Sequence, residues 1–349
     1  MTVERLDRDN RHAGGDGAVG ARRGAEDRAA ALRRIDAWPV DNAAAALVAA
    51  DGAVSARGPV DAVFELASVT KLLTAIGVLL AVEEGAVELD VPAGPPGSTV
   101  RHLLAHASGL AFDEHRVRAA PGERRIYSSA GYEVLAELVA RETGIGFAEY
   151  LAEGVFAPLG MADTVLRGPA GHGARSTVAD LARFAAELQR PTLLDPTTLT
   201  EATTVQFPGL DGLLPGYGMQ RPNDWGLGFE LRGGKSPHWT GGRNSPHTFG
   251  HFGQSGTFLW VDPAAGCACV ALTDRAFGGW ATPLWPALSD AVVTGGDGKA
   301  AGDGKAAGDG KAAGDGKAAG DGKAAGDGKA AGDGKAAGDG KATGGGADA

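Results

Sequence analysis

Two residues three positions apart, Ser68 and Lys71, have the types and the spacing of a serine nucleophile and an amine base. A serine hydroxyl is a weak nucleophile at its own pKa, so it needs a neighbouring group that takes its proton. On a helix this spacing places the two side chains together, and a helix N-terminus would lower the pKa of the lysine and favour oxyanion charge. The pattern predicts acyl transfer through Ser68 with Lys71 as base, although on spacing alone a capped helix with a surface lysine is the simpler interpretation.

Lysine usage favours the catalytic interpretation. Lys71 and Lys235 are the only lysines before residue 296, whereas arginine is frequent in that part of the chain. A general base must lose its proton, which a desolvated lysine does and an arginine does not. Lys235 lies in the loop sequence Gly-Gly-Lys-Ser-Pro, where we predict a solvated surface charge.

Tyr127 is the candidate proton donor to the leaving group. It follows Arg124 and Arg125, whose positive charge should lower the pKa of the phenol and ease proton transfer. The alternative interpretation is a tyrosine of the hydrophobic core.

A predicted strand around Gly253 supplies the candidate substrate contacts. Glycine permits close approach to the backbone, and the next amide, that of Gln254, could form an oxyanion hole together with the amide of Ser68. His251 should share a strand face with Gly253, line the cleft and titrate near neutral pH. A β-bulge at Gly253 and a plain half-buried strand histidine are the alternatives.

The elements that position these residues alternate between strand and helix signals. An Asp-Gly turn predicts a hairpin over 45–57, and a glycine just beyond 68–84 suits the left-handed C-cap of a helix. The helix over 178–188 opens with Thr177 and Asp180, close to a capping box. Further helices are expected at 135–141, 147–155 and 284–292, and strands at 226–231, 248–253, 257–261 and 268–273.

Four segments in order resemble motifs of the serine β-lactamase and penicillin-binding-protein superfamily, especially its class C, D-aminopeptidase and esterase branch. They are Phe-Glu-Leu-Ala-Ser-Val-Thr-Lys at 64–71, Leu-Leu-Ala-His-Ala-Ser-Gly-Leu at 103–110, Tyr-Ser-Ser at 127–129 and His-Phe-Gly at 251–253. The likeness covers roughly residues 41–292. It implies an α/β fold of the β-lactamase/transpeptidase kind, with an antiparallel sheet flanked by helices and a helical insertion lobe. It also implies a small-molecule substrate and no cofactor.

Two positions depart from the family pattern. Ser129 stands where the family has an asparagine that orients the lysine and binds the substrate carbonyl, so a water should fill the gap beside it. His251 stands where a lysine begins the third motif, which weakens the case for a penicillin carboxylate. We therefore expect hydrolysis of small esters or amides with weak or no β-lactamase activity; a catalytically inactive binding or regulatory module is the alternative. The resemblance assigns catalysis to Ser68, Lys71 and Tyr127, and substrate or oxyanion contact to Ser129, His251, Gly253 and Gln254.

By composition the chain divides into three parts. Residues 1–40 are charged and glycine-rich with almost no aliphatic side chains, which predicts a disordered arm. Residues 41–295 form the predicted serine hydrolase domain. Residues 296–349 are mainly repeats of the neutral hexapeptide Gly-Asp-Gly-Lys-Ala-Ala, which predicts a disordered tail.

Charge and hydropathy argue against several partners. A net charge of −10 disfavours nucleic acid, and the apolar run at 72–82 is too short to cross a membrane. Since no early apolar run resembles a secretory signal, we expect the protein in the cytoplasm. Cys267 and Cys269 should be buried free thiols, which fits a reducing compartment, and the oligomeric state stays open.

Two further clusters have competing interpretations. His102 and His106 are four apart, as helix-borne metal ligands can be, but Leu103 stands where a metalloprotease helix has glutamate. We therefore predict a structural His106 and no metal site. The aromatic segment at 237–242 either lines the cleft or packs as a loop.

Overall fold

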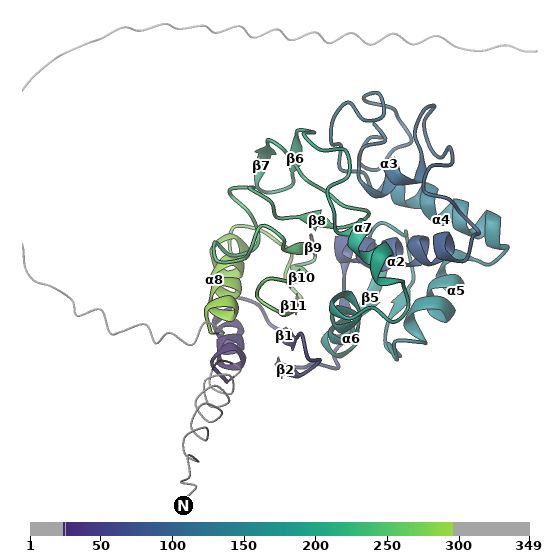
Figure 1. Cartoon of the computed structure of the whole chain (residues 1–349). Coiled ribbons are helices and arrows are strands. Elements are labelled where there is room, and N and C mark those ends of the chain that lie inside the picture. Colours follow the sequence, from purple (N-terminus) through teal and green to yellow (C-terminus); the bar gives the residue numbers. More distant parts are fainter. Residues whose placement is uncertain (1–23, 25, 296–349) are drawn as a thin grey trace, which may run out of the picture. The chain divides into compact units, whose positions relative to one another are not determined.

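Six strands form one sheet in the order β2-β1-β11-β10-β9-β8 (Figure 1). This computed structural model describes residue 24 and residues 26–295, so the predicted tail and most of the predicted arm lie outside the described residues. Every neighbouring pair in the sheet is antiparallel. The strands are β1 (Ala43–Ala49), β2 (Val54–Arg57), β8 (Glu230–Leu231), β9 (Phe249–Gly253), β10 (Thr257–Asp262) and β11 (Cys267–Thr273).

Both faces of the central strands are covered, because successive side chains enter two different hydrophobic cores. In β11, Val270 and Leu272 point into the core shared with the larger helical part, whereas Cys267 and Cys269 point into the core beneath α8 (Ala281–Thr294). Burial on both sides explains the unbroken apolar run of this strand. The two cysteines are free and buried, as predicted.

In Figure 1, helices α2 to α7 lie on one side of the sheet and α8 lies on the other. Helix α2 contacts α4 and α5, and α6 packs along β1, β10 and β11. This arrangement confirms the expected sheet with flanking helices and a helical insertion. The helices are α2 (Thr70–Glu83), α3 (Val100–Leu104), α4 (Ala130–Thr143), α5 (Phe147–Leu151) with the short π-helix η3 (Ala152–Phe156), α6 (Val178–Gln189) and α7 (Pro196–Ala202).

Short strands connect these helices. β3 (Phe64–Glu65), β5 (Ala174–Ser176) and β4 (Val165–Leu166) form a small sheet, and β6 (Gly212–Leu214) pairs with β7 (Gly218–Gln220) in a hairpin. β3 leads directly into the turn that carries Ser68.

The folded part begins earlier than the predicted boundary at Asp41, which is a correction. A helical segment at 26–31 continues into the 3₁₀ turn η1 (Leu32–Ala37). Leu32 and Ile35 on this turn are buried in the core beneath α8. Their spacing of three creates one apolar face, which the charged composition of the first forty residues obscured.

Several predicted elements also differ at their ends; the helices expected over 135–141 and 284–292 extend over 130–143 and 281–294. The helix after Ser68 starts at Thr70, because a 3₁₀ turn precedes it. The strand expected over 226–231 is reduced to β8, because the amide of Gly226 donates to the Phe229 carbonyl at 2.8 Å and closes a tight turn.

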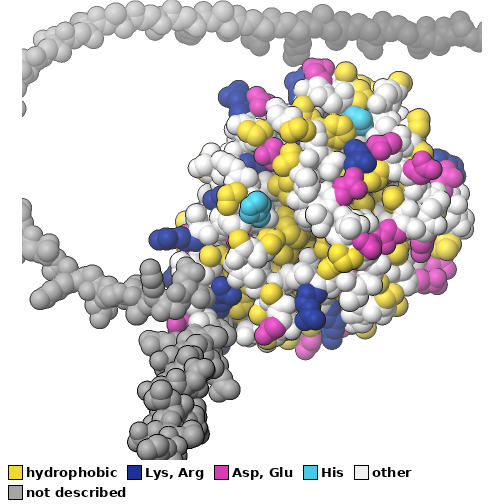
Figure 2. Space-filling model, viewed as in Figure 1, with side chains coloured by type: hydrophobic (Ala, Val, Ile, Leu, Met, Phe, Trp, Pro, Cys, Tyr) yellow, Lys and Arg dark blue, Asp and Glu magenta, His cyan; other side chains and the backbone are white. Residues whose placement is uncertain are grey.

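None of the described helices is long and apolar enough to span a membrane. On the face shown in Figure 2, acidic and basic side chains are interspersed. That face therefore has no basic stripe of the kind that nucleic acid binding requires.

Candidate active site

Ser68 lies in the 3₁₀ turn η2 (Ala67–Val69), immediately before α2. Ala67 has a φ of +45°, a left-handed conformation that is strained for a residue with a side chain. Gly253, at the end of β9, packs on this turn, and a Cβ there would collide with the Leu66 carbonyl oxygen. Its regular pairing with β10 argues against a β-bulge, so glycine serves here to let the strand approach the nucleophile turn.

The side chain of Lys71 is completely buried beside Ser68. Its Nζ donates to Ser68 Oγ at 3.4 Å, to Ser129 Oγ at 3.0 Å and to the Gly171 carbonyl oxygen at 2.8 Å. Burial lowers the pKa of Lys71 to about 7, and the charge of Glu133 opposes that shift. A large fraction of the protein at neutral pH therefore carries the neutral amine that accepts a proton.

Ser129 replaces the asparagine of the family without leaving a gap. It precedes α4, and its hydroxyl reaches Lys71 directly, so the expectation of a bridging water is corrected. The carbonyl of Gly171 completes the contacts of the amine. A Cβ on Gly171 would lie 3.1 Å from that of Ser129, so a larger residue would crowd this contact. Gly171 was not among the predicted site residues, and its one signal in the sequence is the Gly-His-Gly run at 171–173.

The phenol of Tyr127 is partly buried and lies between Lys71 and His251. Its ring centroid is 4.7 Å from Lys71 Nζ, and its hydroxyl lies 3.1 Å from His251 Nε2. The predicted lowering of its pKa is wrong, because burial raises the pKa of Tyr127 and a hydrogen bond with Ser68 offsets only part of that rise. The phenol therefore keeps its proton throughout the neutral range.

The two arginines before Tyr127 do not act on the phenol. Arg125 is buried and donates to backbone carbonyls, at 2.6 Å to Ala105 and at 3.0 Å to Asn223. Arg124 is exposed. Closeness in sequence therefore does not place either guanidinium on the phenol.

His251 is buried on β9 and faces Tyr127. Its Nδ1 lies 2.6 Å from the carbonyl oxygen of Phe252, which only accepts, so Nδ1 carries the proton and Nε2 accepts from the tyrosine hydroxyl. Burial, and then the charge of Lys71, lower the pKa of His251 to about 3. His251 lines the cleft as predicted, but the prediction that it titrates near neutral pH is wrong.

A cavity of about 310 Å³ opens in front of Ser68. Tyr127 and His251 lie in its wall. Gln254 also borders it, as an oxyanion hole formed by the Ser68 and Gln254 amides would require. The remaining lining residues were not predicted from the sequence; they are Phe112, Leu214, Pro215, Trp225, Glu230 and Phe252.

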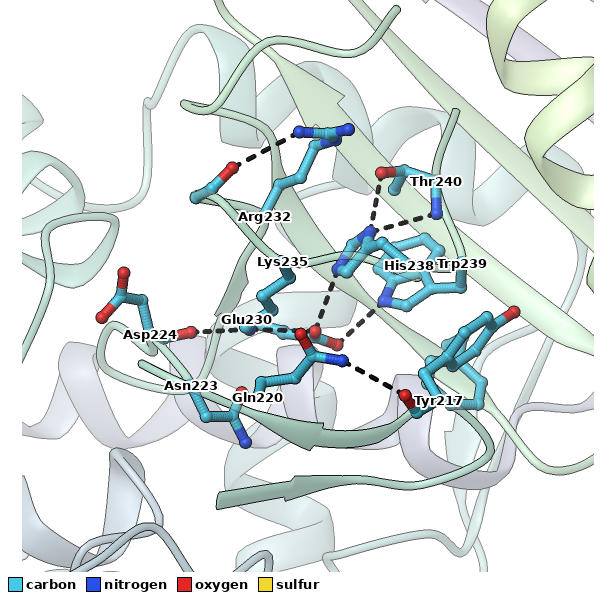
Figure 3. Close-up of polar contacts among 12 residues, drawn as sticks. Tyr217, Gln220, Asn223, Asp224, Glu230, Arg232, Lys235, His238, Trp239 and Thr240 are labelled. Atoms are coloured by element: carbon cyan, nitrogen blue, oxygen red, sulfur yellow. Dashed lines mark hydrogen bonds and ion pairs between the residues drawn. The ribbon is translucent and has the colours of Figure 1, made fainter. Parts of the chain in front are cut away.

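A buried ion pair joins Lys235 to Glu230, one of the residues that line the cavity (Figure 3). Lys235 Nζ is 3.0 Å from Glu230 Oε1 and donates to the Asp224 carbonyl at 2.8 Å. His238 Nε2 and Trp239 Nε1 contact the same carboxylate at 3.0 Å and 2.8 Å. Burial alone would raise the pKa of Glu230, but Lys235 and His238 hold it well below its usual range. The carboxylate is therefore ionised.

The burial of Lys235 corrects one prediction, and the packing of the segment at 237–242 decides between its two interpretations. Lys235 is not a solvated surface charge, since its side chain is only 1% exposed. The aromatic segment at 237–242 packs as a loop with His238, Trp239 and Thr240 buried, and it contributes no residue to the lining of the cavity.

Within the part of the chain that the structure describes, no group of three His, Cys, Asp or Glu side chains could hold a metal ion. His106 is buried, and its Nδ1 accepts from the Ser128 amide at 3.1 Å, which is a structural contact. His102 Nδ1 lies 2.9 Å from the hydroxyl of Thr99.

Solved structures share this fold. A β-lactamase from Mycobacterium bovis is 61% identical, with a TM-score of 0.75, and the match covers 76% of this chain and 98% of that one. The simvastatin synthase of Aspergillus terreus is 20% identical with a TM-score of 0.65, covers 77% of this chain and 98% of that one, and supports the fold alone.

Curated relatives match at lower identity. Esterase EstB of Burkholderia gladioli is 27% identical over 336 residues, 66% of this chain and 82% of that protein. Penicillin-binding protein 4* of Bacillus subtilis is 30% identical over 30% of each chain, and the D-alanyl-D-alanine-carboxypeptidase/endopeptidase AmpH of Escherichia coli is 28% identical over 31% of this chain and 38% of that one. The chain thus spans about a third of the length of these last two relatives. The family described as Beta-lactamase matches residues 32–292, and the chain therefore belongs to the β-lactamase family.

Proposed function

We propose that the protein is a serine hydrolase that forms an acyl-enzyme on Ser68 and acts on small esters or amides. The observation that carries this proposal is the buried amine of Lys71, held within 3.4 Å of the Ser68 hydroxyl, with a pKa of about 7. An amine in that state at neutral pH matches the requirement for a general base.

In the proposed reaction, Lys71 takes the proton of Ser68 while Oγ attacks the substrate carbonyl carbon. The oxyanion lies between the amides of Ser68 and Gln254. Tyr127, which keeps its proton because its pKa is raised, delivers that proton to the leaving group, and the Lys71 ammonium restores it. Water then releases the acyl group from Ser68, with Lys71 again as base.

Esters are the preferred substrates in this proposal. His251 is neutral at physiological pH, so it offers no cation to a penicillin carboxylate. Ser129 contacts Lys71 directly, which argues against the alternative of an inactive binding module. The esterase relative supports the same choice. We propose the cytoplasm as the compartment, which the free thiols of Cys267 and Cys269 support.

A fluorophosphonate probe tests the activated serine. It should label the native protein and fail with Ser68→Ala. Absence of labelling in the folded native protein would contradict the hydrolase proposal.

Short-chain nitrophenyl esters and nitrocefin, measured side by side, test the substrate class. We expect ester turnover to exceed nitrocefin turnover, and both to disappear with Ser68→Ala. Faster hydrolysis of nitrocefin would overturn the preference for esters.

A further inference from the structure

A second, larger hollow adjoins the catalytic cavity. Its volume is about 810 Å³, and it shares Phe112, Tyr127 and Pro215 with the cavity at Ser68. We call it the outer groove. Ser68 borders the catalytic cavity, which we call the inner cavity, and does not line the outer groove.

Tyr127 lines both hollows, so a substrate that contacts its hydroxyl extends into both of them. The carbonyl carbon that Ser68 attacks must lie in the inner cavity, whereas the leaving group must reach the hydroxyl of Tyr127 at the boundary. The inner cavity of about 310 Å³ then holds the acyl group, and the outer groove holds the leaving group. This assignment rests on the proposed function.

The outer groove has a basic lining in an acidic protein. Five arginines and three carboxylates line it, whereas the whole chain has a net charge of −10. Two of the carboxylates already have partners, because Glu114 lies 3.0 Å from Arg116 and Asp211 lies 3.3 Å from Arg221. The third carboxylate, Asp113, carries a single negative charge and cannot neutralise the remaining arginines.

Arg118 and Arg124 are exposed and are not paired with any carboxylate that lines the groove; Arg124 has only a long ion pair with Glu123. The Arg124 side chain is 56% exposed, lies 3.9 Å from Glu123, and donates to the Arg118 carbonyl oxygen at 3.5 Å. Arg118 forms no ion pair with any carboxylate of the described residues. Two guanidinium groups on one segment with unused donors favour a carboxylate or phosphate ligand.

Apolar side chains line the same groove. Phe112, Leu213 and Met219 are 54%, 58% and 53% exposed, and they are three of the nine large hydrophobic residues exposed among those described. A gathering of exposed apolar side chains at one hollow marks a binding surface.

From the charge, the apolar lining and the junction at Tyr127, we infer that the outer groove binds the leaving group, and that this group is an apolar alcohol bearing an anionic substituent. The anion contacts Arg118 and Arg124, and the apolar body of the alcohol packs on Phe112, Leu213 and Met219.

Two matched esters test the inference. Both carry a butanoyl group on the same hydroxycoumarin, one with an acetic acid arm and the other with its neutral carboxamide. At low salt the anionic ester should have the higher kcat/KM, roughly threefold to tenfold, and the ratio should fall toward one in high salt. A third ester with a phosphonate arm identifies which anion is preferred.

The variant Arg118→Gln/Arg124→Gln should bring the ratio close to one, whereas Arg34→Gln on η1, outside the groove, should leave it unchanged. Equal kcat/KM for the two esters in the active native protein would overturn the inference while leaving the proposed function intact. Binding to Ser68→Ala, followed by coumarin fluorescence, gives the same comparison without turnover. Tighter binding of the anionic ester there supports the groove even if the serine proves inactive, and equal binding rejects it.

Discussion

Lys71 Nζ lies closer to the hydroxyl oxygen of Ser129, at 3.0 Å, than to that of Ser68, at 3.4 Å. A serine hydroxyl holds the amine in place without adding a negative charge. A carboxylate at this position would raise the pKa of Lys71 and keep the amine protonated. Ser129 therefore orients the amine of Lys71 without placing a charge beside it.

Removal of the base should abolish turnover. We expect Lys71→Met to lower kcat/KM for nitrophenyl esters by at least about 10³-fold, the upper part of the range for general-base groups. Lys71→Arg should be equally inactive, because a guanidinium does not lose its proton. In the native protein, kcat/KM should rise through a midpoint near pH 7 as Lys71 loses its proton. An active Lys71→Arg protein would show that another group acts as base.

The burial of Lys71 should also destabilise the fold at neutral pH. Its pKa is about 7 in the folded protein against an ordinary 10.5, so between these values the unfolded chain binds a proton that the folded chain lacks. The free energy of unfolding therefore rises with pH over this interval. We expect Lys71→Met to be more stable than the native protein at pH 7, with the difference shrinking toward pH 10, in urea titrations. A variant less stable than the native protein at pH 7 would contradict this.

Ser129→Ala removes one acceptor from the ammonium form of Lys71. Without it the pKa of Lys71 should fall further, so the midpoint of the pH dependence of kcat/KM should move below that of the native protein. We also expect kcat to fall by roughly tenfold to a hundredfold, because the amine is less well oriented. Ser128→Ala is a matched control, since that hydroxyl bonds to the Ala111 carbonyl instead. If the midpoint stays the same in Ser129→Ala, the two side chains are not coupled.

Much of the site could be predicted from short-range pattern. The pair Ser68 and Lys71 is fixed by helix spacing, and Gly253 is fixed by the strand that ends beside the nucleophile turn. Gly171 could not be predicted, because a loop brings it to the site. Glu230 could not be predicted either, because its place in the wall of the cavity depends on the pairing of β8 with β9. The Gly171 carbonyl lies 100 residues beyond the lysine that it contacts.

The predicted titration behaviour failed for one physical reason. The expectations for Tyr127 and His251 relied on residue type and on charges near in sequence, whereas burial dominates both shifts. Arg125 shows the same limit, since its guanidinium is used by backbone carbonyls. The burial of Lys235 likewise depends on its ion pair with Glu230 of β8, which the Gly-Gly-Lys-Ser-Pro sequence alone does not reveal.

His251 should matter as an acceptor and not as a titrating group. Its pKa of about 3 predicts no histidine inflection in kcat/KM between pH 5 and pH 8. We expect His251→Phe to leave the Tyr127 hydroxyl without its acceptor and to lower kcat about tenfold, with the shape of the pH profile retained. A profile that loses an inflection near pH 6 in this variant would mean that His251 titrates in the native protein.

The Glu230 and Lys235 pair should stabilise the fold as a unit. Lys235→Met leaves a buried carboxylate without its cation and should lower the free energy of unfolding by about 3–5 kcal/mol, measured by urea titration. Glu230→Gln should also be destabilising, and the double variant should recover part of the loss, because neither charge then remains unpaired. Additive effects of the two substitutions would mean that the side chains do not act as a pair.

Loss of Lys235 should also weaken substrate binding. Its Nζ holds the Asp224 carbonyl, and the next residue, Trp225, forms part of the wall of the catalytic cavity. We expect Lys235→Met to raise KM for short-chain esters more than it lowers kcat, since the groups around Ser68 stay in place while the wall loosens. Kinetics well below the unfolding temperature separate this from a simple loss of folded protein, which would lower kcat in proportion and leave KM unchanged.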